Sequence, residues 1–132
     1  MDLKLEDNIW FDGFVPHESV IQYYNNLSLF VAVSRRESFG VSILEAAACE
    51  IPSITSNIGG LVEVNKDNYT GVLINPDDPK KLAESIINLY EDKKLRIKLG
   101  INARKRVIEK FNWNDNVNQM INIYKSYDNI NE

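Results

Sequence analysis

The sequence is poor in the residues that form covalent cross-links or bind metals. It has one cysteine, Cys49, and one histidine, His17, among 132 residues. A lone cysteine excludes an internal disulfide and fits a reducing compartment. Cys49 lies in an alanine-rich run, where we interpret it as a small packing residue. Neither a metal site nor a Cys–His catalytic pair is expected, and we predict no cofactor.

Long apolar runs and an excess of positive charge are also missing. No apolar run approaches the roughly 18 residues of a membrane span. The acidic start "MDLKLEDN" does not resemble a signal peptide. The net charge of −4 and the pI of about 5.1 argue against general binding to nucleic acid or to anionic membranes. These features predict a cytoplasmic protein without a nucleic-acid partner.

What is present is the composition of one soluble globular domain, with 44% hydrophobic and 26% charged residues. Short β-rich apolar runs alternate with helical patterns. We expect strands at 9–14, 28–34, 52–56 and 70–76, helices at 17–26 and 41–49, and a turn with a short helix at 59–65. This alternation predicts an α/β fold, a Rossmann-like parallel sheet with crossover helices.

After Pro76 the pattern becomes helical throughout, so we divide the single domain into an α/β part, 1–76, and a helical part, 77–127. Asp78 is suited to cap a helix and Pro79 to its first position. Further helices are expected from Lys93 and after Asn112. Their apolar stripes are predicted to face the core: Leu82, Ile86 and Leu89; Leu95, Leu99, Ala103 and Val107; Trp113, Val117, Met120, Ile121 and Tyr124.

The stretch "SRRESFGVSILEAAACE" is the strongest candidate for chemistry, because it places two glutamates around a helix start. It follows a strand, and ligands of open α/β sheets bind outside the carboxyl ends of strands. A helix beginning near Gly40 offers free N–H groups to an anion. Glu37 in the loop and Glu45 on the second helical turn are each suited to accept hydroxyl hydrogen bonds. This pattern suits a polyol–phosphate–polyol ligand; the alternative is a capping or surface role for both glutamates.

A second glycine turn strengthens the functional interpretation. In "SNIGGLVEV", Gly59 and Gly60 follow the next strand and precede a short helix. Because the carboxyl ends of parallel strands share one edge of a sheet, these amides are expected to face the same cleft.

Several segments, in order, resemble the donor domain of a GT-B, family-4-type retaining glycosyltransferase (glycosyl transferases group 1). They are "FDGFVP", "FVAVSRRESFGVSILEAAACEIPSITSNIGGLVEV", "TGVLINPDDPKKLAESI" and "NARKRVIEKFNWN", which cover nearly the whole chain. The two glutamates, separated by seven residues and a Phe-Gly turn, are the most specific part. The resemblance implies an incomplete half of a GT-B fold.

The resemblance also implies roles for individual residues. Glu37 would be the catalytic-site carboxylate that contacts the donor sugar, and Glu45 would bind the ribose hydroxyls. The amides of Phe39, Gly40 and Val41 would bind sugar or phosphate. The full set of substrate-binding residues expected is Ser38, Phe39, Gly40, Val41, Glu45, Gly59 and Gly60.

The implied reaction is transfer of a hexose from a UDP-, GDP- or ADP-sugar, with retention, in polysaccharide biosynthesis. The acceptor would be a glycan or a lipid-linked glycan that binds through an amino-terminal domain. In the full-length enzyme this would place the protein in the cytoplasm, or peripherally at the inner membrane face.

The sequence departs from the family pattern at several points. Glu50 and Asn68 stand where the family favours glycine, so left-handed backbone is expected at both. The acceptor domain, the first two donor-domain strands and their pyrophosphate-binding Arg and Lys are not found. Arg35 and Arg36 do not map onto that pair, and we interpret them as solvated loop charges.

Turnover by this chain alone is therefore not expected. The alternative is a non-catalytic α/β module that binds a nucleotide or a partner protein. Without the missing strands, the 28–33 strand would have a bare edge. We expect strand 9–14 to move in beside it, or a second copy to cover it in a homo-oligomer.

Overall fold

A three-stranded parallel sheet forms the centre of the protein. The computed structural model describes residues 4–128. The strands are β1 (Phe30–Ala32), β2 (Ser53–Ser56) and β3 (Gly71–Ile74), in the order β1-β2-β3. Val31 pairs with Ile54, which in turn pairs with Val72. Every residue of the central strand β2 is buried, including the polar Ser53, Thr55 and Ser56.

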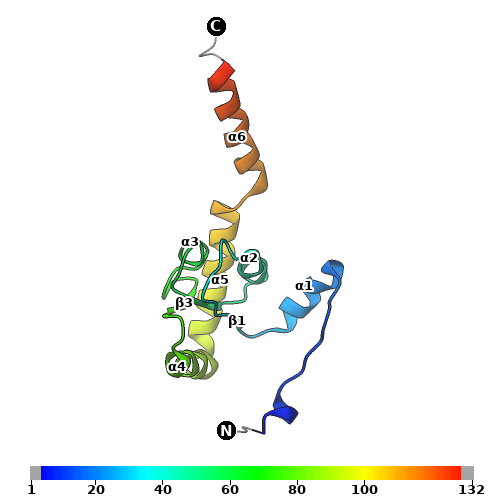
Figure 1. Ribbon diagram of the computed structural model, residues 1–132, viewed down its shortest axis with the longest axis vertical. Coiled ribbons are helices and arrows are strands. Elements are labelled where there is room, and N and C mark those ends of the chain that lie inside the picture. The colour runs from blue at the N-terminus through cyan, green and yellow to red at the C-terminus, as the bar shows by residue number, and fades with distance from the viewer. Residues whose placement is uncertain (1–3, 129–132) are drawn as a thin grey trace.

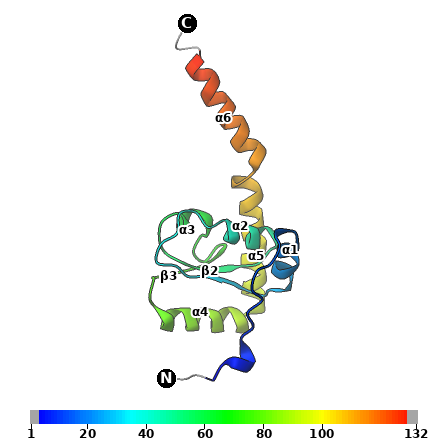
Figure 2. The same cartoon turned by 45° about the vertical axis from the view of Figure 1, so that its right-hand side comes forward.

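Helices cover both faces of this sheet. The chain runs through a 3₁₀ turn η1 (Glu6–Asn8), then α1 (His17–Asn26), α2 (Val41–Ala48), α3 (Leu61–Val64), α4 (Pro79–Glu91), α5 (Lys93–Lys110) and α6 (Trp113–Asp128). Figure 2 shows α4 on one side of the sheet and α2 and α3 on the other. The predicted parallel α/β fold with carboxyl-terminal helices is confirmed.

The core consists of one apolar cluster on each sheet face and a third between α1 and α2. On the α4 side, Ile54, Ile74, Leu89 and Leu99 pack together. On the other side, Ile43, Leu61 and Val64 do so. The third cluster is Tyr24, Ala46 and Ile51, with Cys49 packed against it as expected.

The helix starts follow the predicted capping. Asp78 accepts a hydrogen bond from the Lys81 amide at 2.9 Å, and Pro79 occupies the first helical position. Asn112 caps α6 through the Asn114 amide, also at 2.9 Å. The left-handed backbone expected without glycine is present, with φ of 61° at Glu50 and 56° at Asn68.

Two expectations about apolar segments are wrong. Residues 9–14 form no strand and therefore do not pair with β1, and Trp10, Phe11 and Phe14 are 79–93% exposed. A β-rich segment becomes a strand only beside another strand, and none lies next to this one. The apolar stripe of α6, which was predicted to face the core, is exposed as well, because α6 extends away from the body (Figure 1).

Candidate functional site

Three loops meet at the carboxyl edge of the sheet. Residues 33–40 connect β1 to α2, residues 57–60 connect β2 to α3, and residues 75–78 connect β3 to α4. Because the strands are parallel, all three loops lie at the same edge, where ligands of open α/β sheets bind.

Glu37 lies in the first of these loops, with its side chain exposed. Its Oε1 accepts a hydrogen bond from the Ser38 amide at 2.9 Å. It lines a hollow of about 480 Å³ together with Arg35, Arg36, Ser38, Ile58 and Gly59. The carboxylate is therefore held locally while it remains open to a ligand.

The start of α2 next to Glu37 depends on Gly40. This residue has φ of 87°, and an added Cβ would lie 2.8 Å from side-chain atoms of both Ile43 and Leu61. No side chain caps the helix, so its first N–H groups stay open to an anion. Val41 is 60% exposed, and the Phe39 ring packs edge-on against Phe111 at 6.0 Å.

The glycine pair of the second loop packs closely against the backbone of the first loop. An added Cβ on Gly59 would lie 2.7 Å from the Glu37 carbonyl oxygen, and one on Gly60 would lie 2.1 Å from the Ser38 carbonyl oxygen. Gly59 also has φ of 44°. The two glycines thus permit close contact between the loops, and Gly59 reaches the hollow beside Glu37.

Glu45 lies on the second turn of α2 and faces α1. Its Oε2 accepts a hydrogen bond from the Tyr24 hydroxyl at 3.0 Å. Burial, reinforced by the Glu45 carboxylate, raises the pKa of Tyr24 to about 12. Glu45 lines a hollow of about 810 Å³ between the two helices. The lining also includes His17, Glu18, Ile21, Tyr24, Asn25, Ala48, Cys49, Glu50 and Arg104.

The two candidate glutamates therefore lie in separate hollows, with the open start of α2 between them. The sequence pattern predicted one polyol–phosphate–polyol ligand for both. It gave no sign of Tyr24 as a partner of Glu45, because a contact between residues 21 positions apart leaves no local pattern.

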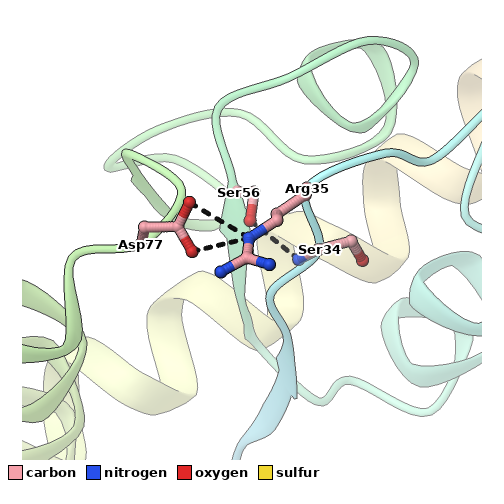
Figure 3. Close-up of polar contacts among 4 residues, drawn as sticks. All are labelled: Ser34, Arg35, Ser56 and Asp77. Atoms are coloured by element: carbon pink, nitrogen blue, oxygen red, sulfur yellow. Dashed lines mark hydrogen bonds and ion pairs between the residues drawn. The ribbon is translucent and has the colours of Figure 1, made fainter.

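A third hollow, of about 670 Å³, lies at the carboxyl ends of all three strands. The Arg35 Nε donates to Oδ1 and Oδ2 of Asp77 at 2.8 and 3.1 Å, across the first and third loops (Figure 3). The Ser34 amide donates to the Ser56 hydroxyl at 2.9 Å. No sequence motif identifies Asp77 or Ser56 as a site residue. Their position just after strands, or at the end of one, was the only available signal.

Two kinds of site are not found in the described part of the chain. Residues 4–128 hold no group of three His, Cys, Asp or Glu side chains suited to bind a metal ion. Among the same residues, none of the helices combines the length and apolarity needed to span a bilayer.

The sequence model of the family described as Glycosyl transferases group 1 matches residues 1–106. The chain is 42% identical over 91 residues to the capsular polysaccharide biosynthesis glycosyltransferase CapM of Staphylococcus aureus. That match covers 69% of this chain and 24% of CapM.

Solved structures show the same fold. A sucrose-phosphate synthase from Thermosynechococcus elongatus superposes with a TM-score of 0.85 at 36% identity, over 93% of this chain and 31% of that protein. Anabaena HepE in complex with UDP-glucose superposes with a TM-score of 0.85 at 26% identity, over 92% of this chain and 33% of HepE. The chain spans only 24–34% of the length of the curated relatives it matches.

Proposed function

Because the chain belongs to the glycosyl transferases group 1 family, we propose that it forms the donor-binding part of a hexosyltransferase that uses a nucleoside diphosphate sugar. The observation that carries this proposal is the order of groups along one segment. The Glu37 carboxylate comes first, the uncapped start of α2 at Gly40 second, and the Glu45 carboxylate third.

Each group fits one part of such a ligand. Glu45 lies four residues beyond Val41, about 6 Å along the helix axis, so a ribose held by Glu45 leaves the diphosphate near the start of α2. The open N–H groups there are suited to phosphate oxygens. Glu37, at the other end, is suited to accept hydrogen bonds from the donor hexose. The backbone between the two carboxylates includes Ser38, Phe39, Gly40 and Val41. Gly59 and Gly60 pack against the first part of this segment.

The reaction that follows is cleavage of the bond between the anomeric carbon and the leaving phosphate, and transfer of the hexose to an acceptor with retention. The start of α2 would stabilise the negative charge that develops on the leaving diphosphate. The HepE complex with UDP-glucose supports a nucleotide sugar as the ligand class. The acceptor would be a glycan or lipid-linked glycan, in the cytoplasm or at the inner membrane face.

The test is isothermal calorimetry with UDP, GDP and ADP against the chain and its Glu45→Gln variant. We expect one nucleotide to bind, and the variant to bind it at least about tenfold more weakly because a charged hydrogen-bond acceptor is lost. Glu63→Gln is the matched control, since Glu63 is an exposed glutamate on the neighbouring helix α3. The proposal would be refuted if no nucleotide bound, or if Glu45→Gln bound the nucleotide as tightly as Glu63→Gln.

A second candidate function, pairing with another protein chain, is favoured by the outer edge of β1. Among residues 4–128 no strand pairs with that edge, and Val31 and Val33 are 39% and 44% exposed. Such an edge is a template for another chain, including a second copy. Light scattering tests self-association: a dimer that Val31→Lys dissociates is expected, and a monomer at every concentration would contradict it.

A further inference from the structure

The hollow at the carboxyl ends of all three strands has no role in the donor site described above. Its polar lining is Ser34, Arg35, Ser56, Asn75, Asp77 and Asp78, and its apolar lining is Val33, Ile74, Pro79 and Leu82. At about 670 Å³ it has the size of a small-molecule site. It touches the hollow of Glu37, because Arg35 lines both.

The Arg35–Asp77 pair leaves hydrogen-bonding capacity for a ligand. Only Nε of Arg35 binds the Asp77 carboxylate, and the two terminal amino groups of Arg35 have no partner within residues 4–128. The Ser56 hydroxyl accepts a hydrogen bond from the Ser34 amide but donates one to no described group. The hollow thus presents free donors on Arg35 beside carboxylate acceptors on Asp77 (Figure 3).

The charge of the lining indicates which ligand class fits. Arg35 is the one cation among the lining residues, and Asp77 and Asp78 are two anions, so the local sum is −1. That sum disfavours a phosphate or carboxylate ligand. Alternating donors and acceptors suit vicinal hydroxyl groups, and the apolar side chains suit the C–H face of a sugar ring. A neutral saccharide has both features.

We propose that this hollow binds neutral sugar residues of the acceptor beside the donor site, in addition to the acceptor contacts expected from an amino-terminal domain. The proposal rests on the proposed hexosyltransferase function, since Arg35 connects this hollow to the one that contains Glu37. Arg35 donates from its terminal amino groups to sugar hydroxyls, and Asp77 accepts from them while it fixes the orientation of the guanidinium. The side chains of Val33 and Leu82 contact the sugar face.

The experiment is an NMR titration of the chain with maltose, N-acetylglucosamine and methyl α-mannoside, with inorganic phosphate as the anionic probe. We expect at least one saccharide to shift the amide resonances of Ser34, Asn75 and Asp77, and phosphate to leave them unchanged. No shift with any of the three saccharides overturns the proposal. A shift with phosphate alone overturns the ligand class.

Variants assign the binding to these side chains. Asp77 has φ of 62°, a backbone region that asparagine tolerates, so Asp77→Asn should fold while it loses its charge. Asp77→Asn and Arg35→Gln should each weaken saccharide binding by about three- to tenfold. Lys81→Gln is the control, because it removes a half-exposed ion pair, with Glu84, outside the hollow. Equal affinity in Asp77→Asn, Arg35→Gln and the control overturns the assignment.

A parallel titration with UDP separates this proposal from the one on which it rests. UDP binding without saccharide binding refutes the acceptor hollow and leaves the donor site standing. Saccharide binding at the Asp77 hollow without binding of any nucleotide supports the hollow and refutes the donor site.

Discussion

The hydroxyl of Tyr24 on α1 donates a hydrogen bond to Oε2 of Glu45 on α2 at 3.0 Å. The Tyr24 ring is fixed in turn by edge-on packing against Phe30 at 5.7 Å. Glu45 Oε1 has no partner among the described residues, so it stays open to a ligand hydroxyl. Tyr24 therefore positions the carboxylate that we propose binds the ribose.

Removal of this hydrogen bond should weaken nucleotide binding. We expect Tyr24→Phe to raise the UDP dissociation constant by about three- to fivefold, because the Glu45 carboxylate loses the hydrogen bond that orients it. The measurement is calorimetry beside Tyr23→Phe, the half-exposed neighbour on the same helix. If the two variants bind UDP equally well, Tyr24 has no positioning role.

The raised pKa of Tyr24 predicts a pH dependence of stability. The pKa of Tyr24 is about 12 in the folded protein and 10.0 for an ordinary tyrosine, so the folded protein holds the phenolic proton more tightly. This contribution to the free energy of unfolding is complete below pH 10 and is lost as pH rises through about 12. Urea denaturation at pH 8, 10 and 11 should show the stability advantage of the wild type over Tyr24→Phe shrinking at the highest pH. A constant difference would refute it.

Gly60 should be intolerant of any side chain. A Cβ there would lie 2.1 Å from the Ser38 carbonyl oxygen, so the Glu37 loop must shift. We expect Gly60→Ala to lower the free energy of unfolding by about 1–3 kcal/mol. Gly13→Ala is the control, since it meets no atom within 4 Å and carries only the strain of its positive φ of 68°, about 1–2 kcal/mol. A Gly60→Ala protein as stable as the wild type in thermal unfolding would contradict this account.

Glu50 stores backbone strain at the end of α2. Its φ of 61° favours glycine, and its ion pair with Arg104 is half-exposed at 3.8 Å. Exposed pairs contribute little, so Glu50→Gly should raise the free energy of unfolding by about 0.5–1 kcal/mol. Glu50→Ala removes the same ion pair but keeps the strain. Equal stability of the two variants in urea denaturation would show that the strain is absent.

Local sequence patterns predicted most of the fold. The strands at 30–32, 53–56 and 71–74 lie inside the predicted runs, because each run is β-rich and bounded by turn residues. Asp78 and Asn112 cap the predicted helices, because capping is decided within three residues. The left-handed conformations at Glu50 and Asn68 were expected from the family resemblance, because the family favours glycine at both positions.

The failures concern segments whose structure depends on neighbours. Residues 9–14 have β-rich composition but no adjacent strand, and the apolar stripe of α6 has no described surface beneath it. A hydrophobic pattern specifies a face and not what covers it. The Arg35–Asp77 pair joins residues 42 positions apart, which only the parallel order of the strands brings together.

The most direct test of the account is calorimetry of Glu37→Gln with UDP and with UDP-glucose, or with the nucleotide and nucleotide sugar that the chain prefers. Glu37 lies in the loop before the start of α2, and Glu45 lies beyond that start in a separate hollow. The account predicts that Glu37→Gln binds the nucleotide sugar about tenfold more weakly and the free nucleotide as tightly as the wild type. Equal losses for both ligands, or no loss for either, would contradict it.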